Sequence, residues 1–298
     1  MINKIYGVYF SPVKNTRNTV KKIAGDLAKK LELPVEYIDF TTPLKRGEGW
    51  QFKKEDLVVF GTPTFAGRIP NKILPYVQTL FRGEETLAIP VVTFGNRSFD
   101  NSLIEVKNEL ENHNFRTFAA AAIACEHSFT DRLAKERPDT QDLEKLDAFT
   151  REVAELIKEN IEACVEEKRK EDTTETIGKQ LVTPVVVPGD DPLTKYYVPL
   201  GVDGQPVQFL KAKPKTKEEL CDHCGACAVR CPVAAIDFSD ETMVPGTCIK
   251  CQACVKVCHT GAKYFDDEKF LSHVKMLEEN YSRRAEPAFF IGNEVKQY

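Results

Sequence analysis

Eight of the ten cysteines of this 298-residue chain lie in two runs of the same spacing. The runs are Cys221-x-x-Cys224-x-x-Cys227-x-x-x-Cys231 and Cys248-x-x-Cys251-x-x-Cys254-x-x-x-Cys258. Two-residue spacers let three thiolates of one tight loop reach three corners of a single iron–sulfur cubane. Structural zinc also uses paired C-x-x-C units, but as tetrads, which leaves the fourth cysteine of each run unexplained. A disulfide framework is not expected, because it needs an oxidising compartment and we find no secretory signal.

The spacing resembles that of bacterial two-cluster ferredoxins, in which the fourth cysteine of each run ligates the other cluster. The resemblance implies two [4Fe–4S] clusters in a small α+β ferredoxin domain at 217–267, with two half-units about 27 residues apart. One cluster would be held by Cys221, Cys224, Cys227 and Cys258. The other would be held by Cys248, Cys251, Cys254 and Cys231.

One position departs from the ferredoxin pattern. His259 follows the last cysteine where proline is usual, whereas Pro232 keeps its place after the first run. His259 either donates a hydrogen bond toward cluster sulfur, which would raise the cluster potential, or is a solvent-facing loop residue. His223, inside the first loop, has the same two interpretations. Ligation by either histidine is not expected, because all eight cysteines are present.

Composition excludes several classes of protein. The chain is 42% hydrophobic and 29% charged, as in soluble globular proteins. With a formal net charge of −4 and no long basic run, it is not expected to bind nucleic acid. No apolar run approaches the ~20 residues that span a bilayer, so no membrane contact is expected. We predict a cytoplasmic protein, and the clusters suggest an anaerobic or well-reduced cell.

Residues 1–170 alternate between strand-like and helix-like patterns. Strands are predicted at 4–10, 35–40, 57–61, 87–94 and 116–124. Helices are predicted at 16–31, at 70–81 with a possible bend at Pro75, and at 141–167. A further helix is predicted to follow residues 95–100 and to end at about residue 112. Such alternation predicts an open, doubly wound parallel α/β sheet. Ligands of these sheets lie beyond the carboxyl ends of the strands, which here are followed by loops 11–16, 62–68 and 95–100.

These three loops resemble those that hold the cofactor of flavodoxins. Residues 10–16, FSPVKNT, look like the phosphate loop, and PTFAG at 63–67 and GNRSFD at 95–100 look like the two loops that flank the flavin. With the cysteine runs, the chain resembles the fused flavodoxin–ferredoxin proteins of anaerobic bacteria. The resemblance implies a flavodoxin-like FMN domain at 1–170, with a five-stranded parallel sheet. It gives the FMN-binding residues as Ser11, Asn15 and Thr16 for the phosphate, and Pro63, Thr64, Phe65, Ala66, Gly67, Gly95, Asn96, Arg97 and Phe99 for the ring.

Two features of the FMN site leave alternatives open. The phosphate loop has Val13-Lys14 where the family has Thr-Gly, so Val13 lacks a hydroxyl and Lys14 lacks the conformational freedom of glycine. The lysine could instead offset phosphate charge, so the domain either binds FMN or is an empty flavodoxin-like scaffold. Glu126 and His127, after the fifth strand, are candidates for a proton donor, although a histidine here more often only bonds its loop.

The remaining segments connect the two domains. Residues 171–216 are rich in proline but too apolar to stay solvated, and are predicted to be an ordered linker that packs across both domains. Residues 268–298 are predicted to form a helix and an aromatic tail. The tail would dock onto the flavodoxin domain or onto a second subunit, so a homodimer is possible.

The predicted function is electron transfer between FMN and the two clusters and on to a soluble redox protein. Fusion keeps the donor and the acceptor at high effective concentration. The first alternative is an FMN-dependent oxidoreductase that acts on a small substrate, with the clusters as the electron feed. Whether the chain is an enzyme therefore stays open, with a carrier preferred. No G-x-G-x-x-G nicotinamide motif is present, and a redox sensor is a third, weaker interpretation because no signalling module is visible.

Overall fold

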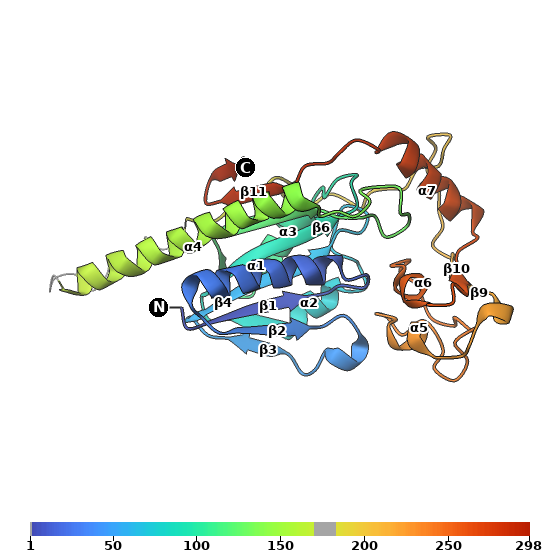
Figure 1. Cartoon of the computed structure of the whole chain (residues 1–298), viewed down its shortest axis with the longest axis horizontal. Helices are drawn as coiled ribbons and strands as arrows, with labels where there is room; N and C mark the ends of the chain where they lie inside the picture. Colours follow the sequence, from blue (N-terminus) through green and yellow to red (C-terminus); the bar gives the residue numbers. More distant parts are fainter. Residues whose placement is uncertain (1, 170–182) are drawn as a thin grey trace.

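The computed structural model describes residues 2–169 and 183–298 of the chain. A central sheet is covered by helices on both faces, and a small cysteine-rich unit lies beyond one end of its strands (Figure 1). We call this unit, residues 217–267, the cysteine domain. The strands of the sheet are β1 (Lys4–Tyr9), β2 (Val35–Asp39), β4 (Asp56–Pro63), β6 (Thr86–Phe94), β7 (Phe115–Thr117), β8 (Ala119–Ala124), β11 (Ala288–Ile291) and β12 (Glu294–Lys296).

Five strands of the sheet run in the order β2-β1-β4-β6-β8, and every neighbouring pair is parallel. Numbered along the chain among these five, this is the 2-1-3-4-5 order of flavodoxin-like sheets. The predicted doubly wound parallel sheet is therefore confirmed. The predicted fifth strand is divided at Phe118, with β7 and β8 pairing with the start and the end of β6.

Helices α1 (Asn15–Leu31) and α4 (Thr140–Arg169) cover one face of the sheet, and α2 (Leu74–Leu80) and α3 (Ser102–Asn112) cover the other. The prediction of a helix at 70–81 was wrong in its extent. Pro75 lies in the first turn of α2, where its missing amide donor costs nothing, so it begins the helix rather than bending it. Residues 81–83 leave the helix as β5 (Phe81–Gly83), which pairs with β3 (Trp50–Phe52) in a small separate sheet.

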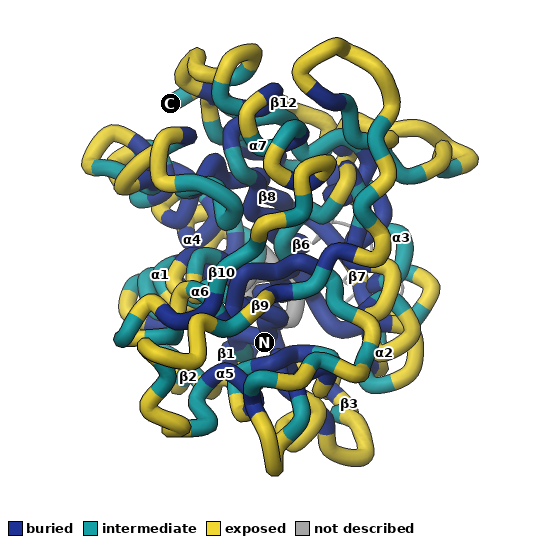
Figure 2. The backbone as a smooth tube through the Cα atoms, turned by 90° about the vertical axis from the view of Figure 1, so that its right-hand side faces the viewer, coloured by how far each residue is buried: buried dark blue, intermediate teal, exposed yellow. Residues whose placement is uncertain are grey.

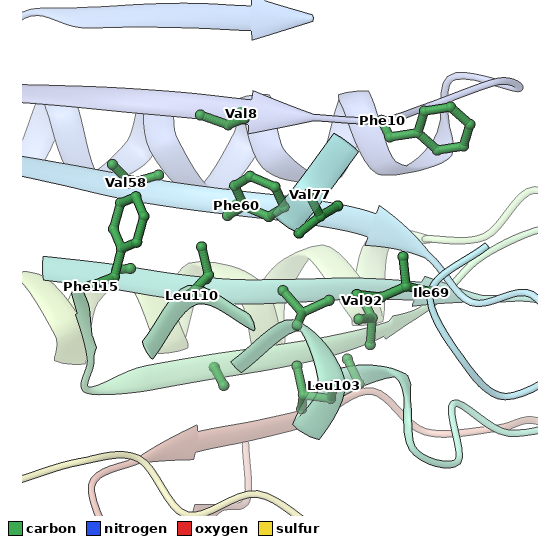
Figure 3. Packing of buried hydrophobic residues seen from close by; sticks show 14 of the residues in the cluster. Val8, Phe10, Val58, Phe60, Ile69, Val77, Val92, Leu103, Leu110 and Phe115 are labelled. Carbon is green, nitrogen blue, oxygen red and sulfur yellow. The ribbon is translucent and has the colours of Figure 1, made fainter. Parts of the chain in front are cut away.

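Each face of the sheet has its own hydrophobic core. Figure 3 shows the core under α2 and α3, in which Val8 of β1 and Val58 and Phe60 of the neighbouring strand β4 belong to one cluster with Val77 and Leu103. A fully buried side chain of this size contributes roughly 1.5–3 kcal/mol. In Figure 2 the central strands are coloured mostly as buried, whereas many of the loops around them are coloured as exposed.

The tail joins the sheet itself. After α7 (Glu268–Asn280), β11 pairs with β8 in the antiparallel direction and β12 folds back on β11. Phe289 is 1% exposed and packs beside Phe149 of α4. The aromatic tail thus docks onto the α/β domain of its own chain, as one of the two predicted alternatives has it. It does so by adding a β-hairpin to the edge of the sheet.

The described part of the predicted linker, from residue 183 onward, is ordered and packs on the sheet. Val185 and Val187 belong to the core under α2 and α3, and the Val185 amide donates to the Thr117 carbonyl. Residues 171–182 of the predicted linker lie outside the described residues. The cysteine domain follows. Its strand β10 (Lys263–Tyr264) pairs with β9 (Lys215–Thr216), which directly precedes the domain, and it contains two short helices, α5 (Ala226–Val229) and α6 (Ala253–Val257). Two short 3-10 turns, η1 (Pro43–Lys45) and η2 (Glu218–Leu220), complete the elements.

Candidate functional site

The two cysteine loops repeat the same backbone conformation. In each loop, the residue before the second cysteine and the residue after it have positive φ: His223 and Gly225 in the first loop, Lys250 and Gln252 in the second. Such left-handed positions turn successive amides toward the inside of a loop, where they can surround an anionic group. In the second loop, the Lys250 amide already points at Cys248 Sγ, at 3.3 Å. The sequence repeat is therefore also a structural repeat.

Four cysteines line one cavity inside the cysteine domain. They are Cys231, Cys248, Cys251 and Cys254, and we call them the proximal set. These are the residues predicted to hold the second cluster. The rest of the cavity wall is largely apolar, and burial raises the pKa of the Cys254 thiol to about 12 and that of Cys251 well above its usual range. Bare thiolates would be unfavourable there, whereas coordination to iron supplies the compensating positive charge.

The other four cysteines, Cys221, Cys224, Cys227 and Cys258, form the distal set. They lie nearer the surface: Cys224 is exposed, and of the four only Cys227 is buried. Two histidine–carboxylate pairs flank them, with His223 Nδ1 2.8 Å from Glu241 Oε1 and His259 Nε2 2.9 Å from Asp222 Oδ2. His259 is thus an exposed loop residue that contacts a carboxylate.

The cysteine domain packs against the end of the sheet that is formed by the carboxyl ends of its parallel strands (Figure 1). Figure 2 views the molecule from that side. Val233 and Ile249 line the proximal cavity and also pack against the core under α2 and α3. Two polar contacts tie the domains together. The Arg46 guanidinium donates to the Pro232 carbonyl at 2.6 Å, and Lys256 Nζ lies 3.0 Å from Glu126 Oε1.

The predicted phosphate loop follows β1 and lies at this same carboxyl end of the parallel strands. Ser11 Oγ accepts a hydrogen bond from the Arg17 amide, which closes the loop around the start of α1. The Thr16 hydroxyl is buried against Thr93, and the Asn15 side chain donates to the Glu126 carbonyl. All three side chains predicted to hold phosphate, those of Ser11, Asn15 and Thr16, therefore already have hydrogen-bond partners within the protein.

The backbone of this loop remains available. Among the described residues, no acceptor is found for the amides of 13–16, which precede and open the 17-residue helix α1. Lys14 has φ 73°, so the lysine adopts the left-handed conformation for which the family has glycine. This costs roughly 1 kcal/mol and leaves the amide arrangement intact. Unpaired amides at a helix N-terminus fit a phosphate group.

The loop after β4, with Pro63 at the end of the strand, folds into a tight turn. Phe65 and Arg68 bond each other through their backbones, and Ala66 and Gly67 both have positive φ. The Thr64 hydroxyl lies 2.6 Å from that of Ser102. Phe65 stays partly exposed, so of the residues predicted to line the ring it is the one here with an available aromatic face.

The loop after β6 is bound by the tail. The Asn96 side chain is 2% exposed; it donates to the carbonyls of Tyr281 and Arg283, at 2.5 and 2.6 Å, and accepts from the Ala285 amide. Gly95 packs against His127: a Cβ at Gly95 would lie 2.2 Å from the imidazole. Asn96 therefore holds the tail, a role that its sequence context did not reveal.

Arg97 and Phe99 of the same loop face other partners. Arg97 pairs with Asp100 and stacks over Tyr197 of the linker, with its guanidinium carbon 4.0 Å from the ring centroid. Phe99 packs on Phe94 and the core. A cavity of about 450 Å³ lies between this loop, the loop after β4 and the linker. Its wall includes Ala66, Gly67, Arg97, Asp100, Lys195 and Tyr197.

His127 is uncharged in this setting. Burial lowers its pKa to about 4, with smaller effects from His273, Arg97 and Lys256. Its Nδ1 accepts a hydrogen bond from the Phe129 amide. The ring thus bonds its own loop, which matches the second of the two predicted interpretations.

A family model described as a 4Fe-4S dicluster domain matches residues 220–262, which span all eight cysteines of the two runs. The chain joins a flavodoxin-like sheet to a dicluster iron–sulfur domain. The cysteine domain is thus similar to 4Fe–4S domains, and the combination with a flavodoxin-like sheet indicates a redox protein. Sequence reasoning found this domain from the cysteine spacing alone, but it missed Arg46, which has no motif around it.

Several solved structures are similar to the α/β half. A flavodoxin from the domain Archaea is 17% identical, with 51% of this chain and 96% of that chain covered and a TM-score of 0.35. A short-chain flavodoxin associated with a non-canonical PDU bacterial microcompartment is 15% identical (51% and 95% covered, TM-score 0.37). Rubredoxin oxygen:oxidoreductase from the anaerobe Desulfovibrio gigas is 14% identical (51% and 35%, TM-score 0.35). At such scores the likeness carries no argument, and the strand order is what establishes the fold. Within residues 2–169 and 183–298, no helix is long and apolar enough to cross a membrane.

Proposed function

We propose that this chain passes electrons between a bound FMN and two [4Fe–4S] clusters, and from the clusters to a soluble redox protein. The observation that carries the proposal is the position of the proximal set. Its cavity shares Val233 and Ile249 with the packing against the sheet, on the edge where the phosphate loop lies. The cluster site nearest the α/β domain is therefore also the one nearest the loops that would hold a flavin.

The distal set supports the other end of the route. Cys224 is exposed, so a cluster held there would lie close to the surface of the molecule. The proposed order is thus the flavin loops, the proximal set, the distal set and then the partner protein. When bound, a flavin can take up electrons in pairs and release them singly, which matches clusters that each carry one electron.

The residues present fit FMN at its phosphate end. The free amides of 13–16 would bind the phosphate oxygens, and Lys14 and Arg17 would supply positive charge. At the ring end the fit differs from the family pattern, because Asn96 is held by the tail. Phe65 and the backbone of residues 63–67 and 95–97 would then contact the ring, with Arg97 alongside.

Anaerobic reconstitution tests the proposal. We expect one FMN and eight irons per chain, and cluster signals that appear by electron paramagnetic resonance when the flavin is reduced. Cys231→Ala should remove one cluster and slow the reduction of the other by the flavin. Cys224→Ala should remove a cluster while the remaining one is still reduced at the wild-type rate. Cys125→Ala is the matched control, because this buried cysteine lies outside both sets.

Two results would refute the proposed route. The first is a purified, reconstituted chain that binds no flavin, which would leave the α/β domain as an empty scaffold. The second is a Cys231→Ala variant whose remaining cluster accepts electrons from the flavin as fast as in the wild type.

The cavity of about 450 Å³ favours one alternative, an FMN-dependent oxidoreductase that acts on a small substrate. Arg97 and Lys195 would favour an anionic group there, while Asp100 and Asp190 would oppose a large negative charge. Steady turnover of a small molecule at the flavin, with no protein partner present, would support this alternative and remove the carrier assignment.

A further inference from the structure

Four cationic side chains are buried among the described residues: Arg46, Arg137, Lys250 and Lys263. Arg137 lies in the α/β domain and has a carboxylate partner, Asp142, which is itself 1% exposed. Of the other three, Lys250 and Lys263 belong to the cysteine domain and Arg46 contacts it. No carboxylate lies within ion-pair distance of any of them among the residues that the structure describes.

These three cations are bound by neutral oxygens. Arg46 donates to the carbonyls of Phe40, Thr41 and Pro232. Lys250 Nζ lies 2.6 Å from the Leu210 carbonyl and 3.0 Å from that of Cys248. Lys263 Nζ donates to the Thr216 hydroxyl and the Glu241 carbonyl. Carbonyl dipoles satisfy the hydrogen bonds, but they do not neutralise the charge.

A buried charge without a counter-charge is strongly unfavourable, because it has lost its hydration without gaining a partner of opposite charge. Burial accordingly lowers the pKa of Arg46. A cluster held by the cysteines would place the missing negative charge beside all three cations. Pro232 directly follows Cys231, Lys250 lies between Cys248 and Cys251, and Lys263 is close enough to Cys227 and Cys254 to act on both thiols. A [4Fe–4S] cluster with four thiolates is a net anion, and it gains one further negative charge on reduction.

We propose that Arg46, Lys250 and Lys263 are the fixed counter-charges of the clusters, and that Arg46 tunes the proximal cluster from the α/β domain. A fixed positive charge stabilises the reduced cluster more than the oxidised one, so each of the three raises the potential of its cluster. Because Arg46 reaches Pro232 across the domain boundary, the potential of the proximal cluster depends on how the two domains are docked. The inference rests on the proposed presence of clusters.

Arg46→Gln removes the charge and keeps a side chain that can donate to a carbonyl. In a potentiometric titration followed by electron paramagnetic resonance, we expect the equilibrium constant for reducing one cluster to fall about tenfold or more. The other cluster should change little. Arg46→Lys should stay near the wild-type value, because it keeps the charge. Lys256→Gln is the matched control: Lys256 also joins the two domains, but it is exposed and paired with Glu126.

Iron-free protein gives an independent reading that does not need a loaded cluster. Without the anion, the buried cation is unfavourable, so Arg46→Gln should leave the thermal stability of the iron-free protein unchanged or raised. The same change should lower the stability of the iron-loaded protein. Lys250→Gln should also lower the potential of the same cluster, so it tests the proposal at a second site if the Arg46 variants do not fold.

The outcomes separate this inference from the proposed function. A full complement of iron in Arg46→Gln and Lys250→Gln with wild-type potentials would overturn the counter-charge role and leave electron transfer standing. Equal destabilisation of the loaded and iron-free forms would make Arg46 a purely structural contact. Wild-type protein that binds no clusters would overturn both proposals.

Discussion

Asn96 anchors the tail on the loop after β6, and its removal provides a direct measure of that contact. Asn96→Ala deletes two donated hydrogen bonds and one accepted one, and leaves the carbonyls of Tyr281 and Arg283 and the amide of Ala285 without that partner. At about 1 kcal/mol for each bond, the segment 281–285 should lose about 3 kcal/mol of local stability. Because about 1.4 kcal/mol is a factor of ten, this equals about a 100-fold change in an opening equilibrium.

Hydrogen exchange at the Ala285 amide is the appropriate assay, since this buried amide donates to Asn96 itself. We expect its protection to fall about 100-fold in Asn96→Ala, while amides in β1 and β4 keep theirs. Asn112→Ala is the control, because Asn112 is an exposed residue at the end of α3. Wild-type exchange at Ala285 in the Asn96 variant would refute the anchoring role.

Three further predictions concern the α/β domain. Gly61→Ala places a Cβ 2.3 Å from Val20 Cγ2 and should destabilise the domain by about 1–3 kcal/mol, seen as a lower melting temperature; unchanged melting would show that α1 shifts freely. Glu105→Ala removes the buried carboxylate that binds Arg68 and the Ile69 amide, and should cost about 3–5 kcal/mol in denaturant unfolding, whereas Glu109→Ala, which removes a half-buried carboxylate that accepts one hydrogen bond from Gln78, should cost little. The folded-state pKa of His127, about 4, lies below the unfolded value of about 6.5, so the free energy of unfolding should be constant above pH about 6.5 and fall as the pH decreases toward 4. His127→Gln should reduce that slope, and a titration of the His127 ring by nuclear magnetic resonance with a midpoint near 6.5 would contradict the assignment.

The parallel sheet could be predicted from the sequence because its strands are continuous apolar runs, buried on both faces. Leu57–Gly61 and Leu87–Phe94 carry that signal on their own residues. The three-residue strands β3 and β5 do not, since three residues show no periodicity. The pairing of β11 with β8 could not be read either, because it joins residues far apart in the chain and the aromatic run fits several partners equally well.

For the candidate site, the cysteine spacing together with the ferredoxin resemblance predicts how the ligands group, and four of the cysteines predicted to share a cluster line one cavity, although the grouping itself stays a prediction. The flavin loops were harder. Their sequences resemble those of a family, but which hydroxyl or amide stays available depends on neighbours elsewhere in the chain. Thr16 is used by Thr93 and Asn96 by the tail, and neither contact leaves a local sequence signal.

The return of the chain to β8 through β11 has a consequence for the order of assembly during synthesis. All eight cysteines of the two runs are translated before residues 288–291, so β8 remains an uncovered edge while this segment emerges. An open strand edge invites pairing with other chains. The edge of β8 therefore stays uncovered while the segment with the two cysteine runs is synthesised, and conditions that delay translation between α4 and β11 should increase misassembly.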